Sequence, residues 1–222
     1  MTTNSAPAGW LDDFRSEGSG ENARIGVIFV HGFTGSPASM RPWAQFFSDR
    51  GYAISVPQLP GHGTHWENLN KVSWQSWPSK VMEEVVWMRA RCEKVFIFGL
   101  SMGGCTTLNT AEQVPVDGIV LVNPMSHIPG NQIKFAPIIA IFKKGMPSVG
   151  DDIKKPDVTE WGYDVLPTRG VVQLQKMLLA TRKNLKKVTS PLMLFHSVDD
   201  HVLPVSNTEI IMGEVGTPVN QK

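Results

Sequence analysis

Short apolar runs alternate with helix-like segments along most of the chain. Buried strands are predicted at residues 25–30, 53–57, 94–99, 118–123 and 191–195. Helices are predicted at residues 37–50, 78–91, 102–113, 170–187 and 205–213. The strand runs are apolar throughout rather than alternating, which is typical of a parallel sheet covered on both faces. The pattern therefore predicts an α/β fold with a mostly parallel sheet flanked by helices.

The strand–helix rhythm breaks between residues 124 and 168, a stretch rich in Pro, Gly and Lys. We interpret it as an insertion that forms a small cap over the ends of the strands, and call it the cap segment. The predicted core then comprises residues 1–123 and 169–222, with the cap segment 124–168 between them.

Composition narrows the class of protein. The chain has 222 residues, of which 41% are hydrophobic and 18% charged, so disorder is excluded. A formal net charge of +1 gives no support for nucleic acid as a partner. Two cysteines make neither a disulfide framework nor a zinc site, and no metal or cofactor is expected. The N-terminus lacks the apolar region of a signal peptide, so a cytoplasmic protein is expected.

The stretch Gly99-Leu-Ser-Met-Gly103 matches the motif G-x-S-x-G between a predicted strand and a predicted helix. Small residues on either side of Ser101 allow a strained turn that lifts the serine hydroxyl above the sheet. This context predicts Ser101 as a catalytic nucleophile. The alternative is a Gly-rich connection with an ordinary surface serine.

The stretch His31-Gly-Phe-Thr-Gly35 follows the first predicted strand. Gly32 and Gly35 allow the backbone to turn its N–H groups toward an anion. We therefore predict an oxyanion hole formed by the N–H groups of Phe33 and Met102. His31 is interpreted as a brace for this loop, because a base so early would break the hydrolase order Ser…Asp…His.

Two acids follow the strand that ends at Phe195. Carboxyl ends of parallel strands meet at one edge of a sheet, so Asp199 and Asp200 are both candidates for the triad acid. Asp200 is preferred because the sequence x-x-Leu-Pro follows it. His201 is not favoured as the base, because the imidazole must lie between the acid and the serine.

Five stretches resemble α/β-hydrolases of the bacterial monoacylglycerol lipase and small carboxylesterase family. They are GVIFVHGFTGSPASMRP (26–42), GHGTHWE (61–67), FGLSMGG (98–104), SVGDDIKKPDVTEWGYDVLPT (148–168) and DDHVLP (199–204). Carried over by position, the resemblance implies Ser101 as nucleophile, Asp200 as triad acid, and Phe33 and Met102 as oxyanion amides. It implies that Glu160, in PDVTE, contacts the glycerol end of the substrate. The implied partner is a small lipid ester, with transient contact with lipid aggregates.

The chain departs from the family pattern at its C-terminal end. The family continues into a final strand, a Ser-x-His-Val stretch bearing the triad histidine, and a last helix. Because Val219–Lys222 falls about where that strand starts, we expect the strand, the helix and the catalytic histidine to lie beyond residue 222. The six histidines, none in the family's catalytic position, are His31, His62, His65, His127, His196 and His201.

The sequence thus favours a serine hydrolase that cleaves monoacylglycerols to glycerol and fatty acid. A general carboxylesterase for short to medium acyl esters and an inactive binding protein of the same fold remain as alternatives. Apolar cap residues are expected to cover an acyl-binding pocket, or else to pack on the sheet edge. These residues are Ile133, Phe135, Ile138, Ile139, Ile141, Phe142 and Met146.

Overall fold

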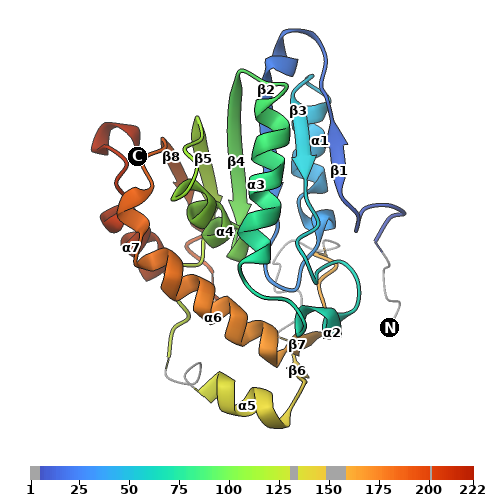
Figure 1. Cartoon of the computed structure of the whole chain (residues 1–222), viewed down its shortest axis with the longest axis vertical. Coiled ribbons are helices and arrows are strands. Elements are labelled where there is room, and N and C mark those ends of the chain that lie inside the picture. The colour runs from blue at the N-terminus through green and yellow to red at the C-terminus, as the bar shows by residue number, and fades with distance from the viewer. Residues whose placement is uncertain (1–5, 131–134, 149–158, 201) are drawn as a thin grey trace.

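The computed structural model describes residues 6–130, 135–148, 159–200 and 202–222. Its main sheet has the strand order β1-β3-β2-β4-β5-β8 (Figure 1). The strands are β1 (Phe14–Ser16), β2 (Ile25–Val30), β3 (Ala53–Val56), β4 (Lys94–Leu100), β5 (Gly118–Val122) and β8 (Leu192–Phe195). Only β1, at one edge, pairs antiparallel among these strands. The mostly parallel sheet predicted from the apolar runs is confirmed.

Helices cover both faces of this sheet. The helices of the described structure are α1 (Arg41–Ser48), α2 (Trp66–Leu69), α3 (Ser76–Arg89), α4 (Met102–Ala111), α5 (Ala136–Phe142), α6 (Thr168–Arg182) and α7 (Ser206–Glu214). The larger buried cluster joins the sheet to α3, α4 and α6, and includes Trp77, Leu108 and Met177. A second cluster joins the other face to α1 and includes Phe29 and Ala44. Continuous burial on both sides explains why the strands carry apolar residues without alternation.

Several predicted boundaries needed correction. The helix predicted at 37–50 is a 3-10 turn (η2, Pro37–Ser39) followed by α1, and Pro42, which has no N–H group, lies in the first turn of α1. The helix predicted at 170–187 ends at Arg182, and a separate 3-10 turn (η4) covers Leu185–Lys187. Further short elements, β1, α2 and the 3-10 turns η1 (Gly20–Arg24) and η5 (Val219–Gln221), were not predicted.

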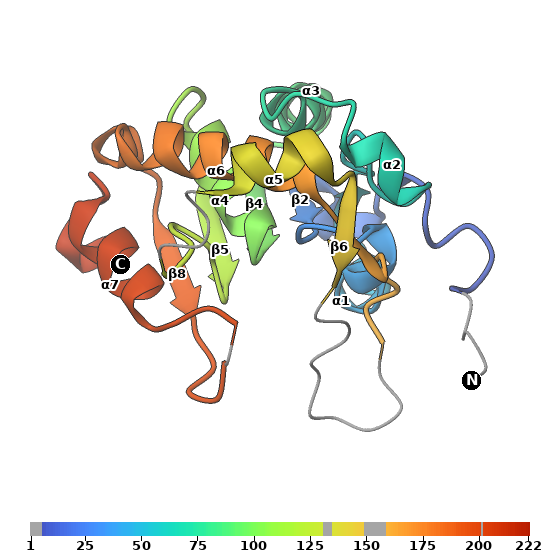
Figure 2. The same cartoon turned by 90° about the horizontal axis from the view of Figure 1, so that it is seen from below.

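The cap segment has regular structure that the sequence pattern did not predict. After β5 the chain forms α5, then β6 (Gly145–Pro147), which pairs antiparallel with β7 (Val165–Pro167) before α6 begins. Seen from below the molecule, α5 crosses α6 on its outer side (Figure 2). Residues 131–134 and 149–158 of the cap segment, including Ile133, lie outside the described residues.

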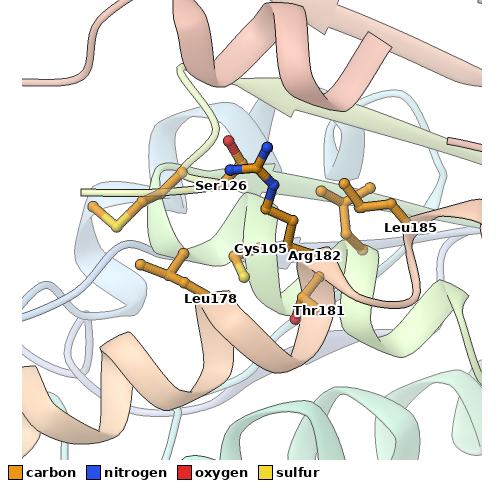
Figure 3. Close-up of a pocket in the computed structure, with 8 residues that line it drawn as sticks. Cys105, Ser126, Leu178, Thr181, Arg182 and Leu185 are labelled. Carbon is orange, nitrogen blue, oxygen red and sulfur yellow. The ribbon is translucent and has the colours of Figure 1, made fainter. Parts of the chain in front are cut away.

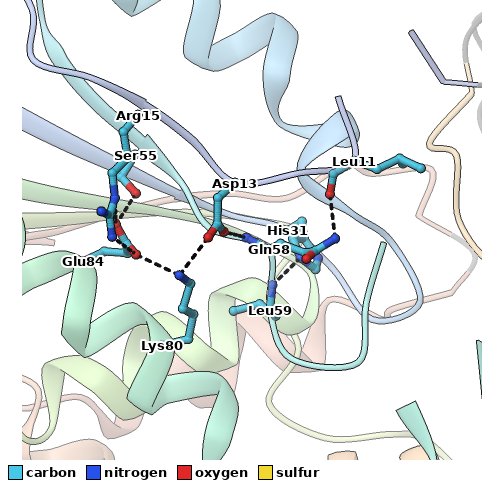
Figure 4. Close-up of polar contacts among 9 residues, drawn as sticks. All are labelled: Leu11, Asp13, Arg15, His31, Ser55, Gln58, Leu59, Lys80 and Glu84. Carbon is cyan, nitrogen blue, oxygen red and sulfur yellow. Dashed lines mark hydrogen bonds and ion pairs between the residues drawn. The ribbon is translucent and has the colours of Figure 1, made fainter. Parts of the chain in front are cut away.

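A buried glutamate holds the N-terminal strand against the sheet (Figure 4). Glu84 of α3, which is 1% exposed, accepts two hydrogen bonds from Arg15 of β1, at 2.7 and 2.8 Å. It also accepts a hydrogen bond from Ser55 Oγ at 2.8 Å and pairs with Lys80 Nζ at 3.2 Å. Burial alone would raise the pKa of Glu84, but these partners hold it below its usual value. The carboxylate therefore stays ionised and joins β1, β3 and α3.

Candidate active site

Ser101 lies at a sharp turn between β4 and α4. Its backbone has φ 54° and ψ −118°, a region that residues with a side chain rarely occupy. The turn is held by a hydrogen bond from Ser101 N–H to Val122 O at 3.0 Å, and the Ser101 carbonyl accepts from Gly104 and Met125 N–H. Such strain persists only where the surrounding structure enforces it, and it often marks a functional position.

The two glycines of the motif are required by packing around this turn. A Cβ atom on Gly103 would lie 2.1 Å from the carbonyl oxygen of Val30 in β2. A Cβ atom on Gly99 would lie 2.5 Å from the carbonyl oxygen of Gly103. The close approach of β2, β4 and α4 therefore explains why glycine occupies both positions beside the serine.

The loop after β2 passes directly over Ser101. A Cβ atom on Gly32 would lie 3.4 Å from Ser101 Cβ and 3.8 Å from Ser101 Oγ. The N–H group of Phe33, the next residue, donates to no described acceptor. Met102 is the first residue of α4, where N–H groups have no carbonyl partner within the helix. The two N–H groups assigned to the oxyanion hole are thus on the two segments that meet at Ser101.

Asp200 lies at the same edge of the sheet as Ser101. Leu100 of β4, Val122 of β5 and Phe195 of β8 form one row across the sheet. Ser101 follows the first of these residues, and Asp200 lies in the loop after the last. Asp200 Oδ1 accepts hydrogen bonds from Val202 and Leu203 N–H at 2.9 and 2.8 Å. The loop is therefore folded around this carboxylate.

Asn123, which sequence reasoning missed, holds Asp200 from the neighbouring strand. Its Nδ2 donates to Asp200 Oδ2 at 2.5 Å, and its Oδ1 accepts from Ser197 N–H at 3.0 Å. Asn123 has φ 43°, and asparagine tolerates this left-handed conformation better than most residues. Asp199 is exposed, and its N–H donates to Ser197 Oγ. Asn123 and the backbone of the loop thus hold the Asp200 carboxylate in place.

His31 braces the loop over Ser101, as we interpreted it from its place in the chain order before Ser101. Its Nε2 accepts a hydrogen bond from Leu59 N–H at 3.2 Å (Figure 4). Its Nδ1 lies 2.9 Å from Gly32 O. A neutral ring with the proton on Nδ1 satisfies both contacts. Burial lowers the pKa of His31 to about 4, which keeps the ring neutral at physiological pH.

The other described histidines are engaged away from Ser101. Burial lowers the pKa of His62 well below its usual value. Their contacts are His62 Nδ1 with Pro60 O, His65 Nδ1 with Glu67 Oε2, His127 Nε2 with Ser206 Oγ, and His196 Nδ1 with Thr208 Oγ1. Among the described residues, no imidazole hydrogen-bonds to Ser101 or Asp200. His201 lies outside the described residues.

The end of the cap segment is fastened to the loop over Ser101. Tyr163 N–H donates to Thr34 O at 3.0 Å. The Tyr163 hydroxyl donates to Gly61 O at 2.8 Å and accepts from Thr64 N–H at 3.1 Å. Glu160 is exposed, three residues before this anchor. The anchor therefore sets the position of the chain around Glu160 relative to the Phe33 loop.

Most apolar cap residues lie on the outer surface of the described structure. Side-chain exposure is 58% for Phe135, 55% for Ile138, 73% for Ile141, 81% for Phe142 and 38% for Met146. Ile139 is half-buried. The exposure of these five residues does not fit packing on the sheet edge, and the acyl-binding pocket under the cap segment stays a prediction.

A narrow gap between α4 and α6, too small to hold a water molecule, lies among Cys105, Ser126, Leu178, Thr181 and Arg182 (Figure 3). None of the candidate site residues lines it. Burial raises the pKa of the Cys105 thiol to about 12, so this cysteine is not a nucleophile. Both cysteines are free and buried, as expected for Cys105.

Two other kinds of site are absent from the described part of the chain. No group of three or more His, Cys, Asp or Glu side chains there could hold a metal ion. No helix there is long and apolar enough to span a membrane.

Known proteins resemble this chain along most of its length. A thermostable monoacylglycerol lipase from a Bacillus species is 39% identical over 198 residues, covering 86% of this chain and 76% of the relative. A carboxylesterase from Bacillus subtilis is 26% identical over 196 residues, covering 88% of this chain and 80% of the relative.

Solved structures give the same fold. A structure described with two metagenome-derived lipolytic enzymes superposes with a TM-score of 0.88 at 32% identity, covering 94% of this chain and 84% of that one. A monoglyceride lipase from Saccharomyces cerevisiae superposes with a TM-score of 0.73 at 16% identity, covering 92% and 78%, and so shows the fold alone. The family model described as serine aminopeptidase, S33, matches residues 21–221. The chain therefore belongs to this family and has the α/β-hydrolase fold.

Proposed function

We propose that this protein is a serine hydrolase of carboxylic esters, and that its substrates are monoacylglycerols, cleaved to glycerol and a fatty acid. The observation that carries the proposal is the strained backbone at Ser101, pressed against Gly32 of the neighbouring loop. The 39% identity with a monoacylglycerol lipase supports the substrate. The family description refers to a peptidase, but both curated relatives named above are ester hydrolases.

In the proposed reaction, Ser101 Oγ attacks the acyl carbonyl and forms a tetrahedral intermediate. The N–H groups of Phe33 and Met102 stabilise its oxyanion, and one such donor typically contributes about 3 kcal/mol. A histidine oriented by Asp200 takes the serine proton and passes it to the leaving glycerol oxygen. Water then releases the fatty acid by the same route. The catalytic groups of this scheme are all groups of the protein.

We further propose that the catalytic histidine lies beyond residue 222 in the gene product. The contacts of the five described imidazoles support this position, because none reaches Ser101 or Asp200. The proposed division of the chain is a core of residues 1–123 and 169–222 with the cap segment 124–168. The cap segment would contribute Glu160 as the residue that selects glycerol.

Glu160 is proposed to accept hydrogen bonds from the two free hydroxyls of the glycerol group. An alkyl ester lacks these hydroxyls, and a site built around them rejects substrates that leave it unpaired. The anchor of Tyr163 on Thr34 supports the role, because it ties the Glu160 segment to the oxyanion loop. A general carboxylesterase is the second candidate, supported by the Bacillus subtilis relative.

The discriminating experiment compares kcat/KM for a monoacylglycerol with kcat/KM for the methyl ester of the same fatty acid, using the full-length gene product. The proposal predicts that the wild type prefers the monoacylglycerol and that Glu160→Gln erodes this preference. Glu67→Gln, at another exposed glutamate, serves as the matched control and should leave it unchanged. A wild type that prefers the methyl ester would identify a general carboxylesterase, and turnover of an amino acid anilide alone would identify a peptidase.

A further inference from the structure

Trp161, near the end of the cap segment, has a backbone conformation that is unusual for so large a residue. Its φ is 49°, in the left-handed region that bulky residues rarely adopt. Among the described residues other than glycine, positive φ angles occur at Thr34, Ser101, Asn123 and Trp161. The first three belong to the candidate active site described above. Because strained residues gather at functional sites, Trp161 is a candidate for a role in the same site.

The indole ring of Trp161 is held by an aromatic contact. Its side chain meets the ring of Trp10 edge to face, with ring centroids 5.6 Å apart and an angle of 80° between the ring planes. The indole Nε1 is buried and donates to no described acceptor. An edge-to-face aromatic pair is favourable beyond the area that it buries. The contact with Trp10 therefore offsets part of the backbone strain at Trp161.

Trp10 is itself tied to the core of the protein. It lies in residues 7–13, which we call the N-terminal segment. Gln58 Nε2 donates to Leu11 O at 2.9 Å, and Gln58 N–H donates to Asp13 Oδ1 (Figure 4). Gln58 follows β3, at the edge of the sheet that also carries the candidate nucleophile. The N-terminal segment thus supports Trp161 from the core side of the molecule.

The backbone of Trp161 determines how the preceding residue is directed. Tyr163 N–H is bonded to Thr34 O at 3.0 Å, which fixes the chain on one side of Trp161. Peptide bonds are planar, so the chain on the other side can turn only through rotation about φ and ψ. A change of φ at Trp161 would therefore swing Glu160 relative to the loop over Ser101.

We propose that Trp10 is a positioning residue for the selection of the alcohol group of the substrate. It holds Trp161 in the left-handed conformation, and Trp161 in turn directs the Glu160 carboxylate toward the glycerol group. The inference rests on the proposed function, in which Glu160 accepts hydrogen bonds from glycerol, and adds the residue that orients it. Trp10 acts here through Trp161 and not on the substrate itself.

The kinetic test uses the full-length gene product and compares kcat/KM for a monoacylglycerol with kcat/KM for the methyl ester of the same fatty acid. We expect Trp10→Ala to lower the preference for the monoacylglycerol about three- to tenfold, with kcat/KM for the methyl ester within about twofold of the wild type. Trp10→Phe keeps an aromatic ring and should restore most of the preference. A merely structural role would lower kcat/KM for both esters alike.

Combining Trp10→Ala with Glu160→Gln tests whether Trp10 acts through Glu160. The double variant should lose no more preference than Glu160→Gln alone, because both changes remove the same interaction. Losses that multiply would show that the two residues act independently and would overturn the proposal. Trp87→Ala, at another half-buried tryptophan near the end of α3, is the matched control and should leave the preference unchanged.

Hydrogen exchange separates this inference from the proposed function, because it needs no substrate. The bond from Tyr163 N–H to Thr34 O protects that amide, so exchange in residues 160–165 reports how firmly the segment is held. We expect Trp10→Ala to speed this exchange about threefold or more. Trp10→Phe and Trp87→Ala should exchange like the wild type.

The outcomes distinguish the two proposals. Unchanged exchange in Trp10→Ala would overturn the positioning role whatever the substrate is. Faster exchange with an unchanged preference, while Glu160→Gln erodes that preference, would also overturn it. A Glu160→Gln variant with the wild-type preference would instead refute the proposed role of Glu160, and exchange alone would then support or overturn the contact of Trp10 with Trp161 as the support of this segment.

Discussion

Asn123 shows what a single residue contributes at the edge of the sheet. Its amide links β5 to the loop after β8 by contacting both Asp200 and Ser197. The motif around Ser101 could be recognised in the sequence because the turn requires glycine at fixed spacing. The contact of Asn123 with Asp200 joins residues 77 positions apart. An asparagine after a strand is common in loops, so no local pattern pointed to this role.

Replacing Asn123 with Asp tests whether it positions Asp200. The variant keeps the size of the side chain but places a second carboxylate beside Asp200, which raises the pKa of the pair. We expect kcat of the full-length protein to fall about tenfold to a hundredfold, with the acid limb of the pH profile moved upward. Asn220→Asp, on an exposed turn, is the control. A wild-type pH profile for Asn123→Asp would exclude the positioning role.

At the scale of elements, the sequence predicted the strands whose burial requires apolar residues. It missed the elements whose structure depends on contacts between distant parts of the chain. The strands at the centre of the sheet were predicted because burial on both faces demands continuous apolar runs. The segment Ala136–Phe142 is apolar on all sides, so its pattern gave neither its helical structure nor the side that faces α6. Short β1 was missed because its attachment depends on Glu84, far along the chain.

The sharp turn between β4 and α4 should not tolerate a side chain at Gly103. Gly103→Ala places a Cβ atom 2.1 Å from Val30 O, so we expect a loss of about 3 kcal/mol in the free energy of unfolding, or failure to fold. Gly213→Ala, on α7, has no atom within 4 Å of the new Cβ and should gain about 0.5–1 kcal/mol. Urea unfolding measures both. Similar stability of the two variants would contradict the proposed close packing.

The attachment of β1 to the sheet should depend on the charge of Glu84. Glu84→Gln leaves Arg15 without its carboxylate and Lys80 with Asp13 alone, so we expect a loss of about 3 kcal/mol at pH 7. The folded-state pKa of Glu84 lies below its ordinary value of 4.5. Its stabilisation is therefore complete above about pH 5 and is lost as the pH falls through the folded-state pKa.

The difference between wild type and Glu84→Gln should accordingly shrink when unfolding is measured in increasingly acidic buffer. Glu93→Gln breaks an exposed pair with Arg24 and should change stability by less than about 1 kcal/mol at any pH. A Glu84→Gln effect independent of pH would show that Glu84 holds β1 through packing and not through its charge.

At the scale of the whole molecule, the sheet is open at β8. Among the described strands β8 pairs only with β5, and its Met193 and Phe195 side chains are 56% and 54% exposed. The sequence predicted this strand but not its place at the edge, because strand order depends on crossovers that no local pattern encodes. An apolar edge strand is a ready template for pairing with another chain.

The 222-residue chain should therefore self-associate through β8. We expect sedimentation velocity to show association that rises with concentration and is weakened by Met193→Lys with Phe195→Lys. Val219→Lys, at an 86% exposed residue outside the sheet, should have no such effect. A chain that stays monomeric at high concentration would contradict this expectation.

The central claim is that Ser101 is the nucleophile of a serine ester hydrolase. Its most direct test is treatment of the full-length gene product with a fluorophosphonate, followed by peptide mass spectrometry. We expect a single adduct on Ser101, absent in Ser101→Ala and accompanied by loss of ester hydrolysis. Labelling that persists in Ser101→Ala, or hydrolysis that survives the substitution, would contradict it.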